Sequence, residues 1–171
     1  MKMRNAAHFG SGIAIAIAFL VATAPNVLAR GDGWQLASLP PSAPAACGST
    51  AVLVTWPVNQ EYVRNLPQPD GTVIQQVTGF LVVNFATGSG GSVTLNTSGP
   101  ARSIIFPNGD FEAISLGLTT GAWTPAQALE VGMPQVFASS GLIDFVIHPD
   151  NTVTPVVIPH NVTNVCAELG A

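Results

Sequence analysis

The fold is decided by residues 75–118, QQVTGFLVVNFATGSGGSVTLNTSGPARSIIFPNGDFEAISLGL. Four segments with the composition of β-strands alternate here with three connections, TGSGG, SGPA and PNG. The connections are three to five residues long, and they are rich in the Gly, Pro, Ser and Asn that supply the unusual or fixed φ angles of tight turns. The stretch therefore predicts antiparallel strands joined as hairpins.

Two of these segments carry the predicted core. In 73–86 apolar residues occupy both alternating sets of positions, which indicates a strand covered on both faces over its middle. In 111–118 one set is mostly aliphatic and the other contains Ala and Ser, so we take the aliphatic set as the inner face. The residues predicted to be buried are Leu81, Val83, Phe85, Ile114 and Leu116.

The remaining chain extends this sheet in both directions. Residues 51–56 form a short apolar strand that Pro57 should stop, because proline has no N–H for a central ladder. The polar segment 59–72 then reads as a loop. Further strands are predicted at 135–139, 142–148 and 152–158. The fold class is therefore all-β: an antiparallel meander of seven to eight strands that forms a barrel-like sheet, with a β-sandwich as the alternative.

Two short helices are also suggested by the sequence. Residues 124–127, TPAQ, have the form of a capping box with proline at the first helical position, although a plain loop over one end of the sheet fits this segment as well. Near the C-terminus, apolar residues at helical spacing from Val162 to Leu169 predict a helix that begins at Asn161 and ends at Gly170.

Three similar segments occur about 40 residues apart: PDG at 69–71, PNG at 107–109 and PDN at 149–151. Each offers a proline with preset φ, then Asp or Asn, then a residue that tolerates the left-handed conformation. A calcium loop needs several oxygen ligands within about a dozen residues, and these segments hold only one or two acids each. We therefore interpret them as turns.

The N-terminus has the features of a signal peptide. Lys2 and Arg4 precede an uncharged apolar run, and Val27 and Ala29 are small residues suited to cleavage after Ala29. A membrane anchor is the alternative, but the apolar run is shorter than the roughly 20 residues that a spanning helix needs. We expect a signal peptide at 1–29, a Pro/Gly-rich linker at 30–46 and one β domain at 47–171.

The composition after residue 29 narrows the possible partners. Three arginines, nine acids and no lysine remain. Since nucleic acids are held by clusters of Lys and Arg, we expect no nucleic-acid partner, and after cleavage no membrane span. The expected location is secreted or extracellular, with association to the cell envelope as a possibility.

Two cysteines remain, Cys47 and Cys166, one at each end of the predicted domain. In an exported protein the oxidising compartment favours a disulfide between them. Two unrelated buried thiols are the alternative. A bridge would close nearly the whole domain and pin its ends.

Several segments resemble a known group of proteins: VTGFLVVNF, TLNTSGPARSIIFPNGDF, SSGLIDFVIHPDNTVT and NVTNVCAELGA. They are similar to an uncharacterised family of small secreted β-rich proteins of high-GC Gram-positive bacteria. The resemblance covers roughly residues 47–170 and implies secretion and a β-rich domain, with Cys166 as its most specific mark. No catalytic residue carries over from that family.

No motif for catalysis, metal binding or a cofactor occurs in residues 30–171: there is no Gly-x-Ser-x-Gly, His-Glu-x-x-His, P-loop or Cys-x-x-Cys. The best polar cluster is Asp144, His148, Asp150 and His160, but Asp144 and His148 lie about 13 Å apart along an extended strand. We therefore assign no catalytic, metal or cofactor residue.

Aromatic residues are the remaining binding candidates, because exposed rings can stack on sugars or peptides. The candidates are Trp123 and Tyr62, with burial in the core as the alternative for Trp123, whereas Trp34 falls in the predicted linker. Two classes of function stay open. The first is a secreted or envelope-associated, non-catalytic binding domain for an apolar small molecule, a glycan or a protein. The second is a small secreted hydrolase or isomerase with a dispersed site.

Overall fold

The computed structural model describes residues 33–171 as one ten-stranded antiparallel β-sheet with two short helices. The elements in chain order are β1 (Gln35–Leu36), β2 (Ala43–Cys47), β3 (Thr50–Pro67), β4 (Val73–Thr87), β5 (Ser92–Asn96), β6 (Ala101–Ile105), β7 (Phe111–Ala122), α1 (Pro125–Val131), β8 (Val136–Ile147), β9 (Val153–Val157), β10 (Asn161–Asn164) and α2 (Val165–Glu168). This confirms the all-β class, the antiparallel sheet and the short C-terminal helix. The predicted signal peptide lies outside the described residues. Within those residues no helix has the length and apolarity to cross a membrane.

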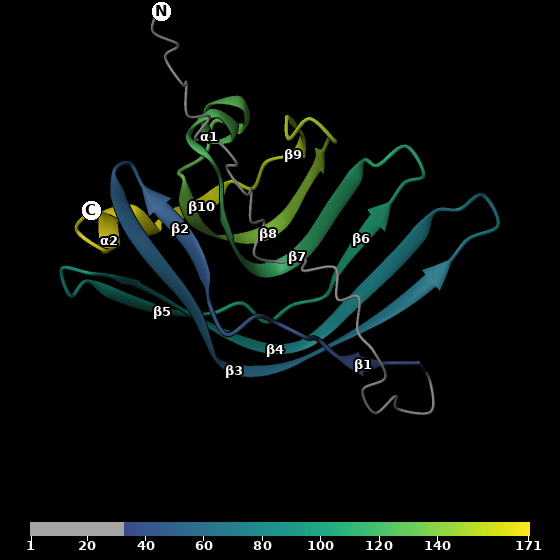
Figure 1. Ribbon diagram of the computed structural model, residues 1–171, viewed down its shortest axis with the longest axis horizontal. Coiled ribbons are helices and arrows are strands. Elements are labelled where there is room, and N and C mark those ends of the chain that lie inside the picture. Colours follow the sequence, from purple (N-terminus) through teal and green to yellow (C-terminus); the bar gives the residue numbers. More distant parts are fainter. Residues whose placement is uncertain (1–32) are drawn as a thin grey trace, which may run out of the picture.

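The sheet is strongly curved and separates into two layers at one end (Figure 1). Its main path runs β1-β3-β4-β6-β7-β8-β10, while β2 adds to β3, β5 to β4 and β9 to β8. The two ends of this path, β1 and β10, are not paired with each other in the described chain, so the sheet does not close. The sandwich alternative therefore fits, and barrel-like is only a loose description.

The first core cluster fills the space between the two layers. Leu81, Val83 and Phe85 of β4 are buried there, as predicted. Residues of β2, β3, β7, β8 and α2 complete the cluster. The disulfide between Cys47 and Cys166 lies at its border and joins β2 to α2, which confirms the predicted bridge.

The second core cluster lies on the concave side of the sheet, under α1. Here the predicted facing of β7 is wrong: Ala113 and Ser115 are buried, Ile114 is half-buried, and Leu116 is 55% exposed. The reason is crowding, because Trp123 and other large side chains already fill the concave side beside Ala113. Small residues fit under them, and the aliphatic residues of β7 face the opposite, convex surface.

Strand β3 is much longer than predicted. It continues through Pro57 and into the predicted loop at 59–72 as far as Pro67. The ladder to β4 shifts register between Thr55 and Val58, so Pro57 sits in a bulge, where its missing N–H breaks no ladder bond. The segment 58–67 is a paired strand.

The predicted linker is also partly ordered, since β1 and β2 both fall within or across its boundary. These strands add to the edge of β3 through backbone pairing, which requires no apolar periodicity. Apolar periodicity in the sequence therefore does not predict them.

Both helices use the predicted kinds of cap. Thr124 and Gln127 form the reciprocal capping box of α1, which confirms the helix over the loop alternative. At the C-terminus, however, Asn164 rather than Asn161 caps α2, because residues 161–164 pair with β8 as β10. The helix is therefore a single turn, and Gly170 follows it with a φ of +70°.

The three predicted turns are confirmed, and they lie in a row at one end of the strands. They join β3 to β4, β6 to β7 and β8 to β9. The third residue of each has positive φ: Gly71 (+86°), Gly109 (+92°) and Asn151 (+67°). An added Cβ on Gly71 would lie 3.4 Å from Pro107, and one on Gly109 would lie 3.1 Å from Pro149. Each glycine thus packs against the proline of the next turn, and Asn151 stands at the end of the row.

Candidate functional site

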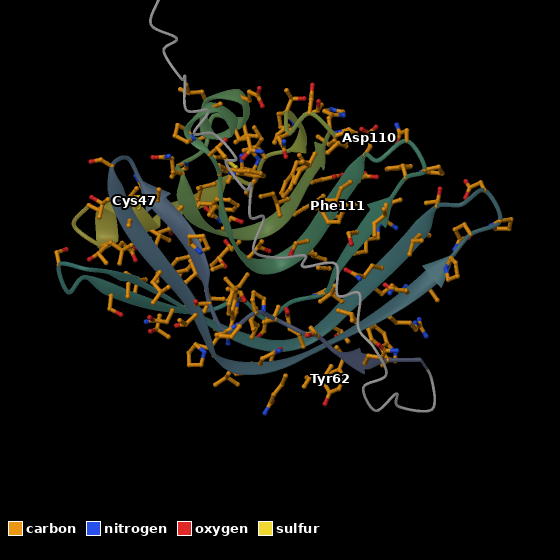
Figure 2. The ribbon with its side chains drawn as sticks, viewed as in Figure 1. Cys47, Tyr62, Asp110 and Phe111 are labelled. Carbon is orange, nitrogen blue, oxygen red and sulfur yellow. A yellow bond between two sulfur atoms is a disulfide. The ribbon has the colours of Figure 1, made fainter. Side chains whose placement is uncertain are left out.

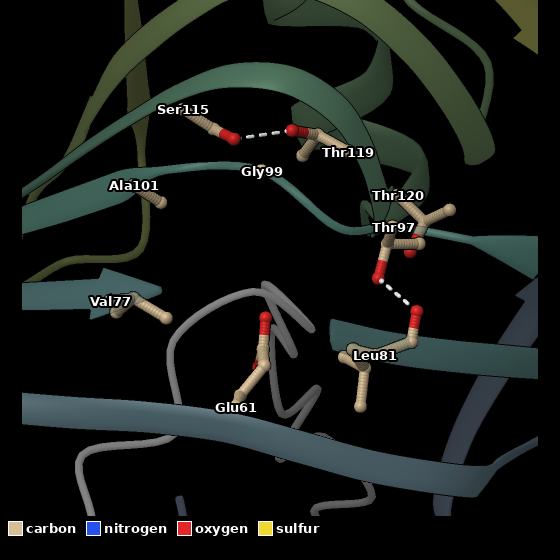
Figure 3. Close-up of a pocket in the computed structure, with 9 residues that line it drawn as sticks. All are labelled: Glu61, Val77, Leu81, Thr97, Gly99, Ala101, Ser115, Thr119 and Thr120. Atoms are coloured by element: carbon tan, nitrogen blue, oxygen red, sulfur yellow. Dashed lines mark hydrogen bonds between the residues drawn. The ribbon is translucent and has the colours of Figure 1, made fainter. Parts of the chain in front are cut away.

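A small cavity opens in the sheet where β4 changes its partner. β4 pairs with β6 as far as Val77 and with β5 only from Val82 onward. Between them the chain crosses from β5 to β6 and packs against β7, where the Leu116 N–H donates to the Pro100 carbonyl at 3.0 Å. The cavity has a volume of about 20 Å³, enough for about one water molecule. Its lining, drawn in Figure 3, is Glu61, Val77, Leu81, Thr97, Gly99, Ala101, Ser115, Thr119 and Thr120.

Glu61 is the titratable group in this cavity. Burial raises the pKa of its carboxyl group to about 7, because an ionised carboxylate loses hydration there. Among residues 33–171 no side-chain hydrogen bond or ion pair to this carboxyl group compensates for the loss. The paired residue on β4 is Gly79, and an added Cβ on Gly79 would lie 2.2 Å from the Gln60 carbonyl oxygen. Only glycine fits opposite Glu61.

Hydroxyl groups form the other polar part of the lining. Ser115 and Thr119 are hydrogen-bonded to each other, and the Thr97 hydroxyl donates to the Leu81 carbonyl oxygen at 3.4 Å. These bonds occupy the hydroxyls with partners other than Glu61 (Figure 3). The cavity can therefore hold a water molecule and a proton on Glu61, but it does not present the hydrogen-bonded nucleophile and base that covalent catalysis needs.

A larger groove lies next to this cavity on the convex face of the sheet. It has a volume of about 400 Å³ and includes the side chains of Trp34, Arg102, Ile114 and Leu116. Val77 and Ala101 line both the groove and the cavity, so the two spaces adjoin.

One wall of the groove is ordered by Arg64. Its guanidinium group lies 4.9 Å from the centre of the Trp34 ring and also donates to the Gln76 side-chain carbonyl at 2.6 Å. A cation over an aromatic face is an attractive arrangement. It fixes Trp34 beside the sheet although the ring lies in the predicted linker.

Arg102 and Asp144 lie on the same convex face, on either side of Ile114 in the register of β6, β7 and β8. Burial raises the pKa of Asp144, and the positive charge of Arg102 opposes that rise. The groove therefore has a basic side at Arg102 within a mostly apolar surface.

The polar cluster predicted from the sequence is not assembled as a site. His148 bonds through Nδ1 to Asp110 at 2.9 Å and through Nε2 to Thr154 at 2.9 Å, at the rim of the sheet. The hydrogen bond with His148, followed by that from Asn108, lowers the pKa of Asp110. Asp144 lies on the convex face, with Ile114 between it and Arg102 in the register. Across residues 33–171 no group of three or more His, Cys, Asp and Glu side chains is arranged to hold a metal ion.

The two aromatic candidates differ in position. Trp123 is buried, with Phe137 stacked at 5.8 Å and Phe145 edge-on at 4.7 Å between ring centres, so it belongs to the core. Tyr62 is half-buried on the convex side of β3 (Figure 2).

Sequence reasoning missed Glu61, Trp34 and Arg102 as site residues. The sequence does contain a signal for Glu61. The tight turn at 69–71 predicts a hairpin, and a strand as long as β4 needs a long partner strand on the other side of that turn. Glu61 falls in that partner strand. No family model, curated protein or solved structure matches this chain.

Proposed function

We propose that the protein is a secreted, non-catalytic binding domain whose convex groove holds an amphipathic small molecule with an anionic group. One observation carries this proposal: Arg102 lines an open, mostly apolar groove of about 400 Å³, with Gln76 as its cross-strand neighbour, in a chain of net negative charge.

The size and lining of the groove favour a small molecule. Ligand sites typically measure about 300–1,000 Å³ and are largely apolar with a few polar groups that fix orientation. Trp34, Ile114 and Leu116 offer apolar surface, and Arg102 offers the charged donors. A guanidinium group binds carboxylate, sulfate or phosphate with paired hydrogen bonds.

The distribution of charge favours an anion at this place. Arg64 and Arg102 are the two cationic Lys or Arg residues in 33–171, against eight acids, and both lie on the convex face in one register row. Arg64 is already engaged with Trp34 and Gln76. Arg102, which is exposed, is therefore the residue that we expect to contact the ligand head group.

Export belongs to the proposal as well. The segment 1–29 has signal-peptide features, and a disulfide is compatible with an oxidising compartment. The resemblance to secreted proteins of high-GC Gram-positive bacteria points the same way.

An enzyme remains the second candidate, because of Glu61. A glutamate with a pKa of about 7 suits a general base at neutral pH, and its cavity adjoins the groove. Binding is favoured because Ser115, Thr119 and Thr97 are bonded away from Glu61.

Calorimetric titration with decanoate below its critical micelle concentration tests the proposal, with decyltrimethylammonium as the cationic probe of equal chain length. We expect preferential binding of decanoate. Arg102→Gln should weaken that binding at least about tenfold, since a hydrogen bond to a charged group contributes roughly 1.5–3 kcal/mol. Leu116→Ser should weaken both probes.

Leu53→Ser is the matched control, because Leu53 is also an exposed leucine (52%) but lies outside the groove. It should leave decanoate binding unchanged. Equal affinity for the two probes, or Arg102→Gln binding decanoate as the natural protein does, would refute the proposed ligand class.

A further inference from the structure

One free edge of the sheet differs from all the others in the described chain. β1 has two residues, β10 has four, and β2 and β9 contain Pro44 and Pro155. Proteins protect exposed strand edges by keeping them short or by placing proline or charge on them. β5 has five residues, SVTLN, with neither proline nor charge, and it lies in a run from 71 to 101 without a single charged residue.

The hydrogen-bond pattern shows which backbone groups this edge presents. Thr97 N–H donates to the Leu81 carbonyl at 3.0 Å, and Thr87 N–H donates to the Gly91 carbonyl at 2.9 Å. Bonded positions alternate along an antiparallel strand, so Val93 and Leu95 direct their backbone groups toward β4. The N–H and C=O groups of Ser92, Thr94 and Asn96 point away from the sheet, and β5 pairs only with β4 among the described strands.

β5 is also held in a regular extended form. On the convex face, Asn84 of β4 donates to the hydroxyls of Ser92 (2.9 Å) and Thr94 (2.8 Å). On the other face, Val93 and Leu95 pack against the first core cluster. The strand is thus fixed before any partner arrives, which lowers the entropic cost of adding another strand. Figure 1 shows β5 at the periphery of the molecule.

We propose that β5 is a dimerisation edge, which pairs antiparallel with β5 of a second copy of this chain about a two-fold axis at Thr94. Each outward-pointing residue then bonds its opposite: Ser92 with Asn96 of the second copy, and Thr94 with its own equivalent. Val93 faces Leu95 of the second copy, so apolar side chains meet apolar ones and polar side chains meet polar ones.

The occupant is a second copy because the edge is complementary to itself. An antiparallel pair of identical strands satisfies two-fold symmetry automatically. The net negative charge of the chain would oppose self-association elsewhere, but no charge occurs from 71 to 101. In a dimer with two-fold symmetry the β5 edges of both copies are paired with each other, so association stops at two copies.

Sedimentation of the full, disulfide-bonded protein from about 1 µM to about 1 mM tests this proposal. We expect a monomer–dimer equilibrium with no larger species. Thr94→Pro removes an outward N–H without touching the ladder to β4, and Thr94→Lys places like charges opposite each other at the axis. Either variant should raise the dimer dissociation constant at least about tenfold, with an unchanged circular dichroism spectrum.

Val156→Lys is the matched control, because it adds the same charge at an exposed position of another edge strand, β9. It should dimerise as the natural protein does. The proposal is overturned if the natural protein stays monomeric up to the highest concentration. It is also overturned if the Thr94→Lys protein dimerises unchanged, since the contact would then use another surface.

Discussion

Replacing Glu61 by glutamine should make the stability of the protein less dependent on pH. In the folded chain burial raises the pKa of Glu61 from 4.5 to about 7. Between these values the unfolded chain has released the proton while the folded chain still holds it. The free energy of unfolding therefore falls as pH rises through this window. Below pH 4.5 the group is protonated in both states, and above about 7 the full loss is present.

The size of the effect follows from the shift. One pKa unit corresponds to about 1.36 kcal/mol, so the rise from 4.5 to about 7 corresponds to about 3 kcal/mol. Glutamine resembles the protonated glutamic acid in shape and never ionises. Glu61→Gln should therefore match the natural protein near pH 4 and exceed it by up to about 3 kcal/mol above pH 8.

Urea unfolding followed by tryptophan fluorescence at half-unit steps from pH 4 to 8.5 measures this difference. Glu168→Gln is the control, because it removes a carboxylate from an exposed position. If the stability difference between Glu61→Gln and the natural protein is constant with pH, the cavity does not hold a protonated glutamate and the reasoning fails.

Three further substitutions test the packing. Phe85→Ala should lower the free energy of unfolding by about 3–5 kcal/mol, because Phe85 has 0% exposure; a loss below about 1 kcal/mol in urea titration would contradict its place in the core. Leu116→Ala should change stability by no more than about 0.5 kcal/mol, since Leu116 is 55% exposed, and a core-sized loss would restore the inner facing of β7. Gly109→Ala should cost at least about 1 kcal/mol more than Gly90→Ala, because both glycines have positive φ but only Gly109 has the Pro149 ring 3.1 Å from an added Cβ. Equal thermal shifts for these two variants would mean that the turns do not pack together.

The turns and the presence of strand β4 could be predicted because the information is local. Pro-Asx followed by Gly or Asn determines a backbone conformation within four residues, whatever the rest of the chain does. Alternation likewise identifies strands. It cannot say which of two faces is inner, and for β7 the answer depended on the tertiary packing of Trp123, which follows the strand directly and fills the concave side beside Ala113.

The candidate site was much harder to predict, because it arises from a change of strand partner. The cavity exists because β4 pairs with β6 over one part of its length and with β5 over another, with residues between that pair with neither of them. Nothing in the composition of β5 or β6 indicates this interruption of the pairing. Glu61 lies in a segment that was predicted to be a loop, because Pro57 was expected to end the strand and instead sits in a bulge. Arg102 and Trp34 come together only through the register of β6 and the path of the N-terminal strands.

The bond between Cys47 and Cys166 turns most of the chain into a covalent ring, with 119 positions from one cysteine to the other. A protease that cuts once inside this ring, for instance in the Gly-rich connection 88–91, opens the ring without releasing a fragment. The nicked protein keeps its mass, plus one water, until a reductant is added, and only then does it separate into two pieces. Damage at a single exposed loop would therefore leave the remaining layers tethered and able to reassemble.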